Sequence, residues 1–221
     1  MKQIIIILMF ILSFIEAKMI PKDFVYIRDE IPNIQEELRY FGTDNFTGTK
    51  INGYLIPKAI LTKEATKALK KVQKELNSFG LGLKIFDSYR PQKAVDHFVR
   101  WGRDLEATQM KNKYYPTVEK KNLFKEGYIA EKSGHSRGST IDLTIIELKN
   151  NIELDMGSHF DFFSKISWVK YIDITPQQRA NRMLLHMVML RYGFKSYLQE
   201  WWHFTLIDEP YPNKYFDFDI K

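Results

Sequence analysis

The stretch Ser133-Gly-His-Ser-Arg-Gly-Ser-Thr-Ile-Asp-Leu-Thr144 joins a glycine-bearing loop to the start of an alternating strand. It contains His135 and Asp142, seven residues apart. Side chains alternate between the two faces of a strand, so Asp142 shares a face with the threonines of this segment, while the isoleucines and leucine occupy the other face. We therefore expect Asp142 to point away from the core and towards a site.

A second histidine and a second carboxylate lie far downstream, in Gln199-Glu-Trp-Trp-His-Phe-Thr205. Two imidazoles, one ligating carboxylate and one spare carboxylate are the groups that a hydrolytic zinc site requires. Zinc bound by His135, Asp142 and His203 would lower the pKa of a water from about 15.7 towards ~7, and Glu200 could relay the proton to the leaving group. Because residues three apart on a strand face opposite sides, Glu200 must lie in the turn before the strand.

Neither half of this pattern is specific alone. A His and an Asp seven residues apart, or a Glu three residues before a His, is more often structural than catalytic. Arg90 strengthens the prediction of a catalytic site from the two motifs together. It lies between a strand predicted over 83–86 and a helix predicted over 91–108, where a side chain is held rigidly yet can face a cleft.

The remaining elements follow from apolar periodicity. A helix capped by Thr62 runs to Gly80, with apolar positions from Ala65 to Phe79. The 91–108 helix directs Val95, Phe98, Val99 and Leu105 inward. Thr175-Pro-Gln-Gln178 is typical of a capping box, and we expect the helix over 176–192 to bury Met183, Leu184, Met187 and Leu190.

Short strands are predicted over 24–27, 38–41, 194–197 and 202–206, the last two as an antiparallel pair, and residues 44–48 form a loop that buries one aromatic ring. Interleaved elements that end in a hairpin favour an α+β domain with a mainly antiparallel sheet flanked by helices. A chain of 221 residues with 44% hydrophobic content suits one such domain. The net charge of +6 arises from scattered basic residues, so we expect no nucleic-acid partner.

The N-terminal segment 1–17 has the character of a signal peptide. Lys2 precedes an apolar run from Ile4 to Ile15, which is shorter than the ~20 residues of a membrane span, and Ala17 offers a cleavage site. A retained anchor is the alternative, since Ile15 is only tolerable three residues before that site. We expect an exported protein, periplasmic or extracellular, with residues 18–221 as its catalytic domain and no span in the mature chain unless the anchor is kept. The lack of cysteine excludes disulfides and lipoprotein processing.

The other histidines suit a metal site less well. We expect His97 at the surface and His186 buried and hydrogen-bonded on a helix. His159, between Asp155 and Asp161, has a small chance of contacting the metal.

The motif Ser133-x-His135-x2-Gly138-x3-Asp142 with Glu200-x-Trp202-His203 resembles the metal-site signature of the VanX-like zinc D-alanyl-D-alanine dipeptidases, part of the wider D,D-peptidase family with the hedgehog-type fold. The likeness extends over about residues 35–206. It includes Leu38-Arg-Tyr40 before Asp44-Asn-Phe-Thr-Gly48, the turn Ser88-Tyr-Arg-Pro91, and Met156-Gly-x2-Phe-Asp161.

The resemblance implies a role for each site residue. His135, Asp142 and His203 would bind one zinc ion, and Glu200 would act as general base and then general acid. Arg90 would stabilise the oxyanion. Asp161 would accept the free ammonium of a dipeptide, and Ser133 would help hold the substrate, although a solvated loop carboxylate and a turn hydroxyl remain the plain alternatives.

Three functions follow in order of preference. The first is a zinc dipeptidase that cleaves D-Ala-D-Ala or a related D,D-dipeptide in cell-wall peptide turnover. The second is a zinc D,D- or L,D-carboxypeptidase that acts on peptidoglycan stem peptides. The third is a non-catalytic wall-binding domain, which the intact Glu200 disfavours because a binding module needs no base.

Overall fold

A five-stranded sheet in the order β2-β4-β5-β7-β6 forms the centre of the molecule, a computed structural model that describes residues 20–221. Its strands are β2 (Gln35–Glu36), β4 (Leu81–Asp87), β5 (Thr140–Glu147), β7 (His203–Leu206) and β6 (Phe194–Ser196). The β2–β4 pair is parallel and the other pairs are antiparallel. A separate antiparallel pair joins β1 (Phe24–Tyr26) to β3 (Ile60–Thr62). The expected signal peptide or anchor, residues 1–17, lies outside the described residues.

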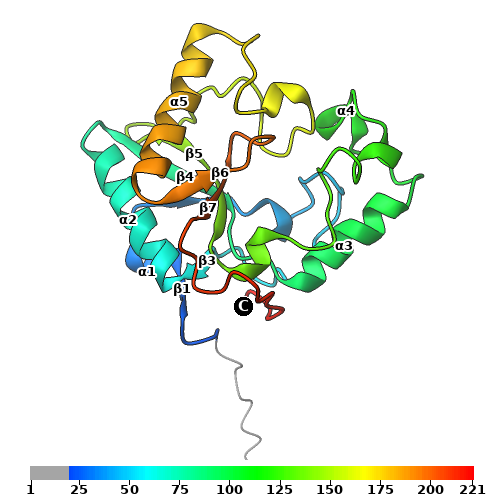
Figure 1. The fold of residues 1–221 in the computed structure, drawn as a ribbon, viewed down its shortest axis with the longest axis horizontal. Helices are drawn as coiled ribbons and strands as arrows, with labels where there is room; N and C mark the ends of the chain where they lie inside the picture. The colour runs from blue at the N-terminus through cyan, green and yellow to red at the C-terminus, as the bar shows by residue number, and fades with distance from the viewer. Residues whose placement is uncertain (1–19) are drawn as a thin grey trace, which may run out of the picture.

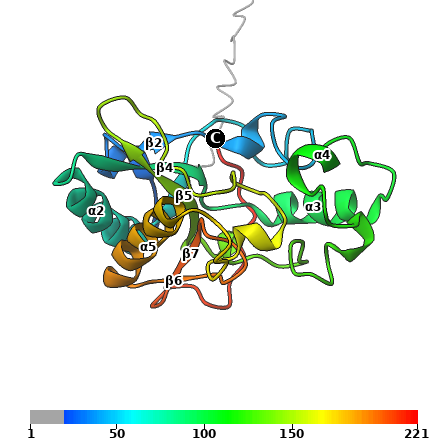
Figure 2. The same ribbon diagram turned by 90° about the horizontal axis from the view of Figure 1, so that it is seen from above.

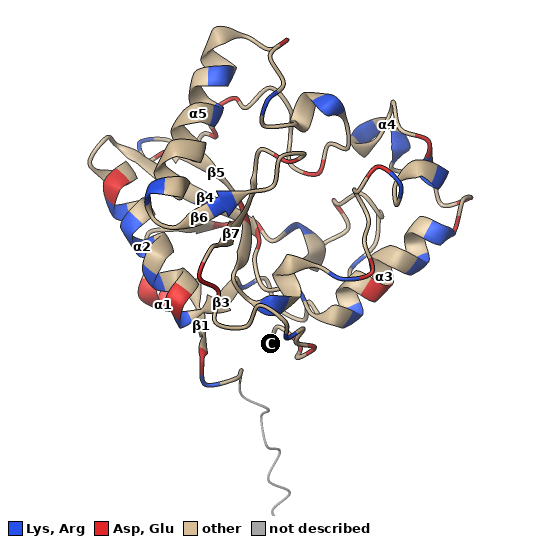
Figure 3. Cartoon of the chain, viewed as in Figure 1, with Lys and Arg blue, Asp and Glu red and all other residues tan. Residues whose placement is uncertain are grey.

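Helices cover the sheet on both sides. The helices α2 (Lys63–Asn77) and α5 (Pro176–Arg191) pack on one side, and α3 (Gln92–Arg103), α4 (Lys111–Tyr114) and long loops lie on the other (Figures 1 and 2). A short helix α1 (Ile27–Glu30) follows β1, and 3-10 turns occupy Arg39–Phe41, Lys120–Asn122, Gly134–Arg137 and Lys165–Ser167. Both basic and acidic residues lie on α1 and α2, and lysines predominate on α2 (Figure 3). The α+β architecture with a mainly antiparallel sheet is confirmed.

Two helices end earlier than the sequence predicts. Thr62 caps α2 as expected, but this helix stops at Asn77 and leaves Phe79 70% exposed. Helix α3 stops at Arg103, and Leu105 is 53% exposed instead of inward. Asp104 ends α3 because its Oδ1 accepts a hydrogen bond from the backbone N–H of Glu106 at 3.1 Å, which closes a turn that competes with the helix.

The strand predicted over 38–41 is wrong. Residues Arg39–Phe41 form a 3-10 turn, because the side-chain amide of Asn45 donates to the carbonyls of Arg39 and Gly42 and curls this segment. The neighbouring loop does bury the ring of Phe46, as expected.

The capping box at Thr175 is confirmed, but the predicted buried face of α5 is wrong. Met183, Leu184, Met187 and Leu190 are exposed, whereas Asn181 and Arg182 are buried. Asn181 Nδ2 donates to the carbonyl of Asp155 at 2.8 Å and Arg182 Nε to that of Met156, bonds that fix the rotation of the helix.

His186 is only partly buried, and its Nδ1 has no hydrogen-bond partner among the described residues, so the expected buried hydrogen bond is wrong. Within residues 20–221, every helix is too short or too polar to cross a bilayer.

Candidate active site

Three adjacent strands present acidic and imidazole side chains in one row. Asp142 of β5 lies directly opposite Asp87 of β4 on one side and opposite His203 of β7 on the other. Directly opposed residues of antiparallel strands have neighbouring side chains on the same face. The register of the sheet therefore places Asp142 beside His203, although 61 positions of sequence separate the two (203 minus 142).

The second imidazole reaches this row from a loop. Ser133 Oγ caps the turn Gly134–Arg137 by accepting from the backbone N–H of His135 at 3.3 Å. Gly138 ends the turn with φ +84°, and a Cβ there would lie 2.2 Å from the ring of Phe24, so this position requires glycine. His135 Nδ1 lies 2.7 Å from the carbonyl oxygen of Ser88. A carbonyl only accepts, so Nδ1 carries the proton and Nε2 presents its lone pair to the site.

His135, Asp142 and His203 bring their ligand atoms together. His135 Nε2 lies 3.3 Å from His203 Nδ1 and 3.3 Å from Asp142 Oδ2, and His203 Nδ1 lies 3.1 Å from Asp142 Oδ1. Four atoms at ~2.0–2.1 Å from a tetrahedral ion are themselves separated by about 3.3 Å. Among residues 20–221, Asp142 Oδ1 is also buried without a hydrogen-bond partner. The donor set and its spacing therefore fit a tetrahedral metal ion.

The converging side chains shift one another's pKa values. Burial would raise the pKa of Asp142, but the two imidazoles hold it well below the usual range. Burial would lower the pKa of His203, yet Asp142, with help from Glu200, raises it to about 9. A metal that binds here must therefore displace a proton from His203.

Glu200 lies in the turn between β6 and β7, as the sequence analysis requires. Its Oε2 is 3.4 Å from His203 Nδ1 and its side chain is 14% exposed. It lies beside the three converging ligands and lines the same cavity. A carboxylate in this place can accept a proton from a water without serving as a ligand.

Arg90 follows β4 and is fixed on several sides. Its Nε and Nη2 lie 2.9 and 2.8 Å from Asp87 Oδ2, and Nη2 lies 3.6 Å from Asp142 Oδ2. The guanidinium also lies over the rings of Tyr40 and Phe98, each 5.1 Å away. Such a guanidinium presents donors at a fixed position without reorganisation.

Asp161 faces the same cavity from the loop after β5. It is 5% exposed, and its backbone adopts φ +60°, an uncommon conformation for a residue other than glycine. Tyr40 donates a hydrogen bond to its Oδ2 at 2.9 Å. Burial and the nearby charge of Asp142 raise the pKa of Asp161 well above its usual range. A cation placed beside this carboxyl group would lower the free-energy cost of ionising it.

Three residues that support this site, Tyr40, Tyr54 and Asp87, have no role predicted from the sequence. Tyr40 contacts Asp161, and Asp87 holds Arg90 while accepting a hydrogen bond from Tyr54 at 2.7 Å. Asp87 lies three residues before Arg90 at the end of a strand, and this position in the sequence could have indicated that Asp87 holds Arg90.

One cavity of about 320 Å³ contains these groups. Its lining includes every residue that the sequence analysis selected: Arg90, Ser133, His135, Asp142, Asp161, Glu200 and His203. This volume lies at the lower limit of the ~300–1,000 Å³ typical of small-molecule sites, so the cavity suits a small ligand.

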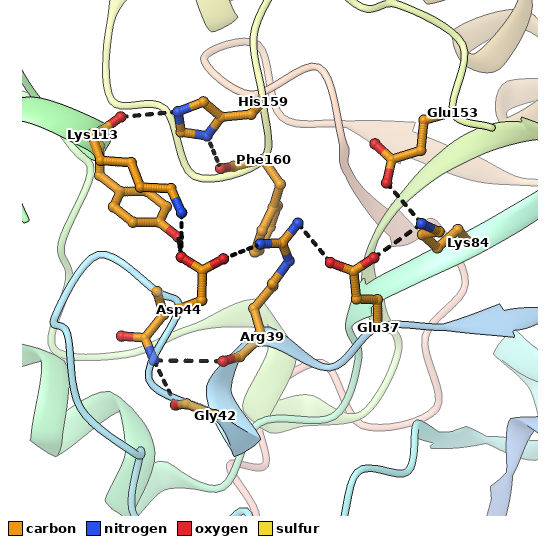
Figure 4. A network of polar contacts seen from close by, with 11 residues as sticks. Glu37, Arg39, Gly42, Asp44, Lys84, Lys113, Glu153, His159 and Phe160 are labelled. Carbon is orange, nitrogen blue, oxygen red and sulfur yellow. Dashed lines mark hydrogen bonds and ion pairs between the residues drawn. The ribbon is translucent and has the colours of Figure 1, made fainter.

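A chain of polar contacts outside the cavity links the segments that carry Tyr40 and Asp161 (Figure 4). Arg39 pairs with Glu37 at 2.7 Å and with Asp44 at 3.0 Å, and Asp44 also pairs with Lys113. His159 lies between two carbonyls, 2.9 Å from that of Lys113 and 2.7 Å from that of Phe160. His159 is thus a loop residue outside the ligand cluster, and the network keeps the two walls of the cavity together.

The sequence of this chain also matches those of known proteins. A family model described as D-ala-D-ala dipeptidase matches residues 21–221. The chain is 41% identical over 198 residues to a D-alanyl-D-alanine dipeptidase of Enterococcus faecalis, with 90% of this chain and 98% of the relative covered. It is 40% identical to one of Streptomyces coelicolor with the same coverage, and 34% identical to one of Escherichia coli, with 79% of this chain and 80% of the relative covered.

A crystal structure of the vancomycin-resistance D,D-pentapeptidase VanY in complex with Zn(II) covers 70% of this chain and 76% of its own, with a TM-score of 0.43 and 12% identity. The family match spans nearly the whole described chain, and the three curated relatives carry the same name. This chain, with its converging His135, Asp142 and His203, belongs to the D-Ala-D-Ala dipeptidase family of peptidases.

Proposed function

We propose that this protein is a zinc-dependent dipeptidase that hydrolyses D-Ala-D-Ala or a closely related D,D-dipeptide. One observation carries the choice of a dipeptide: Asp161 is buried in the same small cavity as the three converging ligands. Among residues 20–221, no cationic side chain lies within ion-pair distance of it. A carboxyl group of this kind is suited to receive the free ammonium of a short substrate, which longer acylated peptides lack.

His135, Asp142 and His203 would hold the zinc ion. Bound there, zinc would polarise the scissile carbonyl and make a neighbouring water more acidic. Ser88 supports the ligand set by holding His135 in the tautomer that offers Nε2.

The chain's own residues supply the remaining steps. Glu200 would take a proton from the attacking water and deliver it to the leaving amine, a contribution of about 10²–10⁴-fold to the rate. Arg90, held by Asp87, would donate hydrogen bonds to the oxyanion that forms at the carbonyl. Asp161 and Tyr40 would orient the ammonium end, and Ser133, whose hydroxyl caps the His135 turn, would line the substrate's path.

The decisive experiment compares hydrolysis of D-Ala-D-Ala with that of N-acetyl-D-Ala-D-Ala, with zinc and with chelator. We expect chelator-sensitive cleavage of the free dipeptide alone, and a loss of at least about 10²-fold in Glu200→Gln at unchanged zinc content. Cleavage of the acetylated compound at a similar rate would assign the protein to the carboxypeptidases. Zinc-loaded protein that cleaves neither compound would contradict the proposal.

Asp161→Asn tests the ammonium site directly. The amide keeps the shape of the side chain but removes its charge, so the preference for the free dipeptide over the acetylated one should fall by about 10-fold or more. The matched control is Asp155→Asn, an exposed carboxylate of the same loop. If the preference is unchanged in Asp161→Asn, Asp161 does not recognise the ammonium group of the substrate.

We further propose that the protein is exported to the periplasm or the extracellular space and acts in cell-wall peptide turnover. The support is the pattern of residues 1–17, with a positive start, a short apolar run and a small residue at its end. Mass spectrometry of the protein from fractionated cells tests this proposal. A mature chain that begins near Lys18 outside the cytoplasm is expected, and a full-length chain found only in the cytoplasm would contradict it.

A further inference from the structure

Residues 216–220, which we call the strap, lie outside the active-site cavity but contact the loops that form it. The strap passes the start of α3, where it is drawn in red in Figure 1. None of its residues is among the described residues that line the cavity of about 320 Å³. Its hydrogen bonds nevertheless go to segments that carry residues of the site.

Phe216 joins two loops of the site through its backbone. Its N–H donates to the carbonyl of Ser136 at 2.8 Å, and its carbonyl accepts from the N–H of Gln92 at 3.0 Å. Ser136 directly follows His135, and Gln92 lies two residues after Arg90. One residue of the strap therefore connects the loop of a candidate zinc ligand to the turn of the candidate oxyanion donor.

The other end of the strap supports the carboxylate that holds Arg90. Ile220 pairs with Tyr54 in a parallel bridge, and its N–H donates to the carbonyl of Gly53 at 2.8 Å. The hydroxyl of Tyr54 donates to Asp87 Oδ1 at 2.7 Å, and Asp87 Oδ2 accepts from Arg90. The position of Asp87 thus depends on a tyrosine whose backbone pairs with the strap.

Tyr89 makes the most direct connection between the strap and the site. Its fully buried ring stacks on that of Phe218, with the ring centroids 4.0 Å apart. Its hydroxyl donates to the carbonyl of Phe218 at 3.0 Å and accepts from the N–H of Phe218 at 2.9 Å. In the chain, Tyr89 lies between Arg90 and Ser88, the residue whose carbonyl holds His135. A displacement of Tyr89 would therefore move both neighbours through the backbone.

Two acidic side chains fix the strap to the first turn of α3. The backbone N–H of Lys93 donates to Asp217 Oδ1 at 2.7 Å, and the ammonium group of Lys93 pairs with Asp219 Oδ1 at 2.7 Å. Lys93 lies three residues after Arg90. Because both carboxylates lie outside the cavity, they can be removed without changing any group of the site.

We propose that the strap positions the two loops of the active site, and that Tyr89 is the positioning residue through which it acts on Ser88 and Arg90. This inference rests on the proposed function. An oxyanion donor is effective only where it is held at a fixed point, and a metal-binding imidazole is oriented by the acceptor on its other nitrogen. A small displacement of either group is enough to reduce the rate.

Tyr89→Phe tests this role, because it removes both hydrogen bonds to the strap and keeps the ring. We expect kcat for D-Ala-D-Ala to fall by about 10-fold and KM to change by less than about twofold, since an oxyanion donor acts in the transition state. Zinc affinity, measured by competition with a chelator, should fall by about 10-fold. The matched control is Tyr115→Phe, another buried tyrosine, whose hydroxyl donates to the carbonyl of Ala107 and which is not among the described cavity residues. It should keep the wild-type kcat and zinc affinity.

A double-mutant cycle separates positioning from a general loss of stability. If Tyr89 acts through Arg90, Tyr89→Phe should lower kcat by less than about twofold in the Arg90→Lys background, where the donor is already displaced. An equal loss in both backgrounds, or a lowered melting temperature with the wild-type kcat, overturns the role of Tyr89 towards Arg90. An unchanged zinc affinity in Tyr89→Phe overturns its role towards Ser88.

Asp217→Ala/Asp219→Ala provides a second test that leaves Tyr89 in place. Loosening the strap should lower both kcat and zinc affinity by about threefold or more. Asp173→Ala/Asp208→Ala makes the same change of charge at two exposed aspartates and should have no effect. If Tyr89→Phe does not fold, the Asp217→Ala/Asp219→Ala variant decides, and wild-type values for it overturn the proposal. If zinc-loaded wild type hydrolyses no dipeptide, the proposed function fails, whereas the zinc affinities still test the strap.

Discussion

Arg90 illustrates how one residue depends on the geometry of its side chain and not only on its charge. Arg90→Lys keeps the positive charge but loses the planar group that binds Asp87 Oδ2 through Nε and Nη2. The ammonium would sit at a different point, away from the developing oxyanion. We expect kcat for D-Ala-D-Ala to fall by about 10²–10³-fold. The measurement is steady-state kinetics, with exposed Arg100→Lys as the matched control; a fall of less than about threefold would exclude Arg90 as an oxyanion donor.

His203 makes metal binding depend on pH. Its pKa of about 9 means that it holds a proton through the neutral range, and a metal ion must displace that proton. Apparent zinc affinity should therefore rise by about tenfold per pH unit up to about pH 9 and then level off. Competition with a chelator at several pH values measures this slope. Since Glu200 contributes to the raised pKa, Glu200→Gln should move the levelling point to lower pH; a flat affinity between pH 7 and 9 would contradict the assignment.

The sequence locates the candidate ligands, Glu200 and Arg90 because each lies in a short segment whose residue types and spacing reflect local chemistry. It does not reveal Tyr40 as the partner of Asp161, since 121 positions separate the two. Nor does it show that Asp87, Asp142 and His203 stand in one row, which depends on the pairing of β4, β5 and β7. Contacts across the sheet are set by register, and one sequence does not specify register between distant strands.

At the level of elements, the sequence predicts where helices lie better than which side they bury. Apolar periodicity places α5 correctly, yet its strongest apolar stripe faces solvent and a polar pair, Asn181 and Arg182, faces the protein. The reason is that buried backbone carbonyls need donors, and those of Asp155, Met156 and Trp168 obtain them from this helix. Hydrogen bonding of a distant loop thus overrides local hydrophobic pattern.

The edge strand β2 contains a carboxyl group that penalises folding at neutral pH. Burial raises the pKa of Glu36 from 4.5 to about 7, so ionisation favours the unfolded chain and stability falls as pH rises from about 4.5 through 7. Glu36→Gln removes this penalty. We expect it to stabilise the protein by about 1 kcal/mol above pH 7 and to have no effect near pH 4. The gain is smaller than the free energy that corresponds to the full pKa shift, because the side chain is partly solvated.

Urea unfolding of wild type and Glu36→Gln across this pH range measures the difference. The exposed Glu106→Gln is the control and should show no pH-dependent gain. Equal stabilities of wild type and Glu36→Gln at pH 8 would mean that Glu36 is well solvated in the folded protein.

At the scale of the whole molecule, the three candidate ligands connect parts of the fold that are remote in sequence. His135 comes from a loop, Asp142 from β5 and His203 from β7, and the two imidazoles are 68 positions apart. The unfolded chain has no such site, so a bound ion stabilises only the folded state. At a thousandfold excess over its dissociation constant an ion contributes about 4 kcal/mol.

Removal of the metal should therefore lower the melting temperature of the whole domain, by about 10 °C for a chain of this length. Calorimetry with and without chelator measures the change, and added zinc should restore the original value. Asp142→Asn, which weakens the site, should melt at nearly the same temperature in both conditions, whereas His159→Ala, outside the cluster, should keep the full response. If chelator shifts wild type and Asp142→Asn equally, the stabilising ion binds elsewhere and the triad is not the metal site.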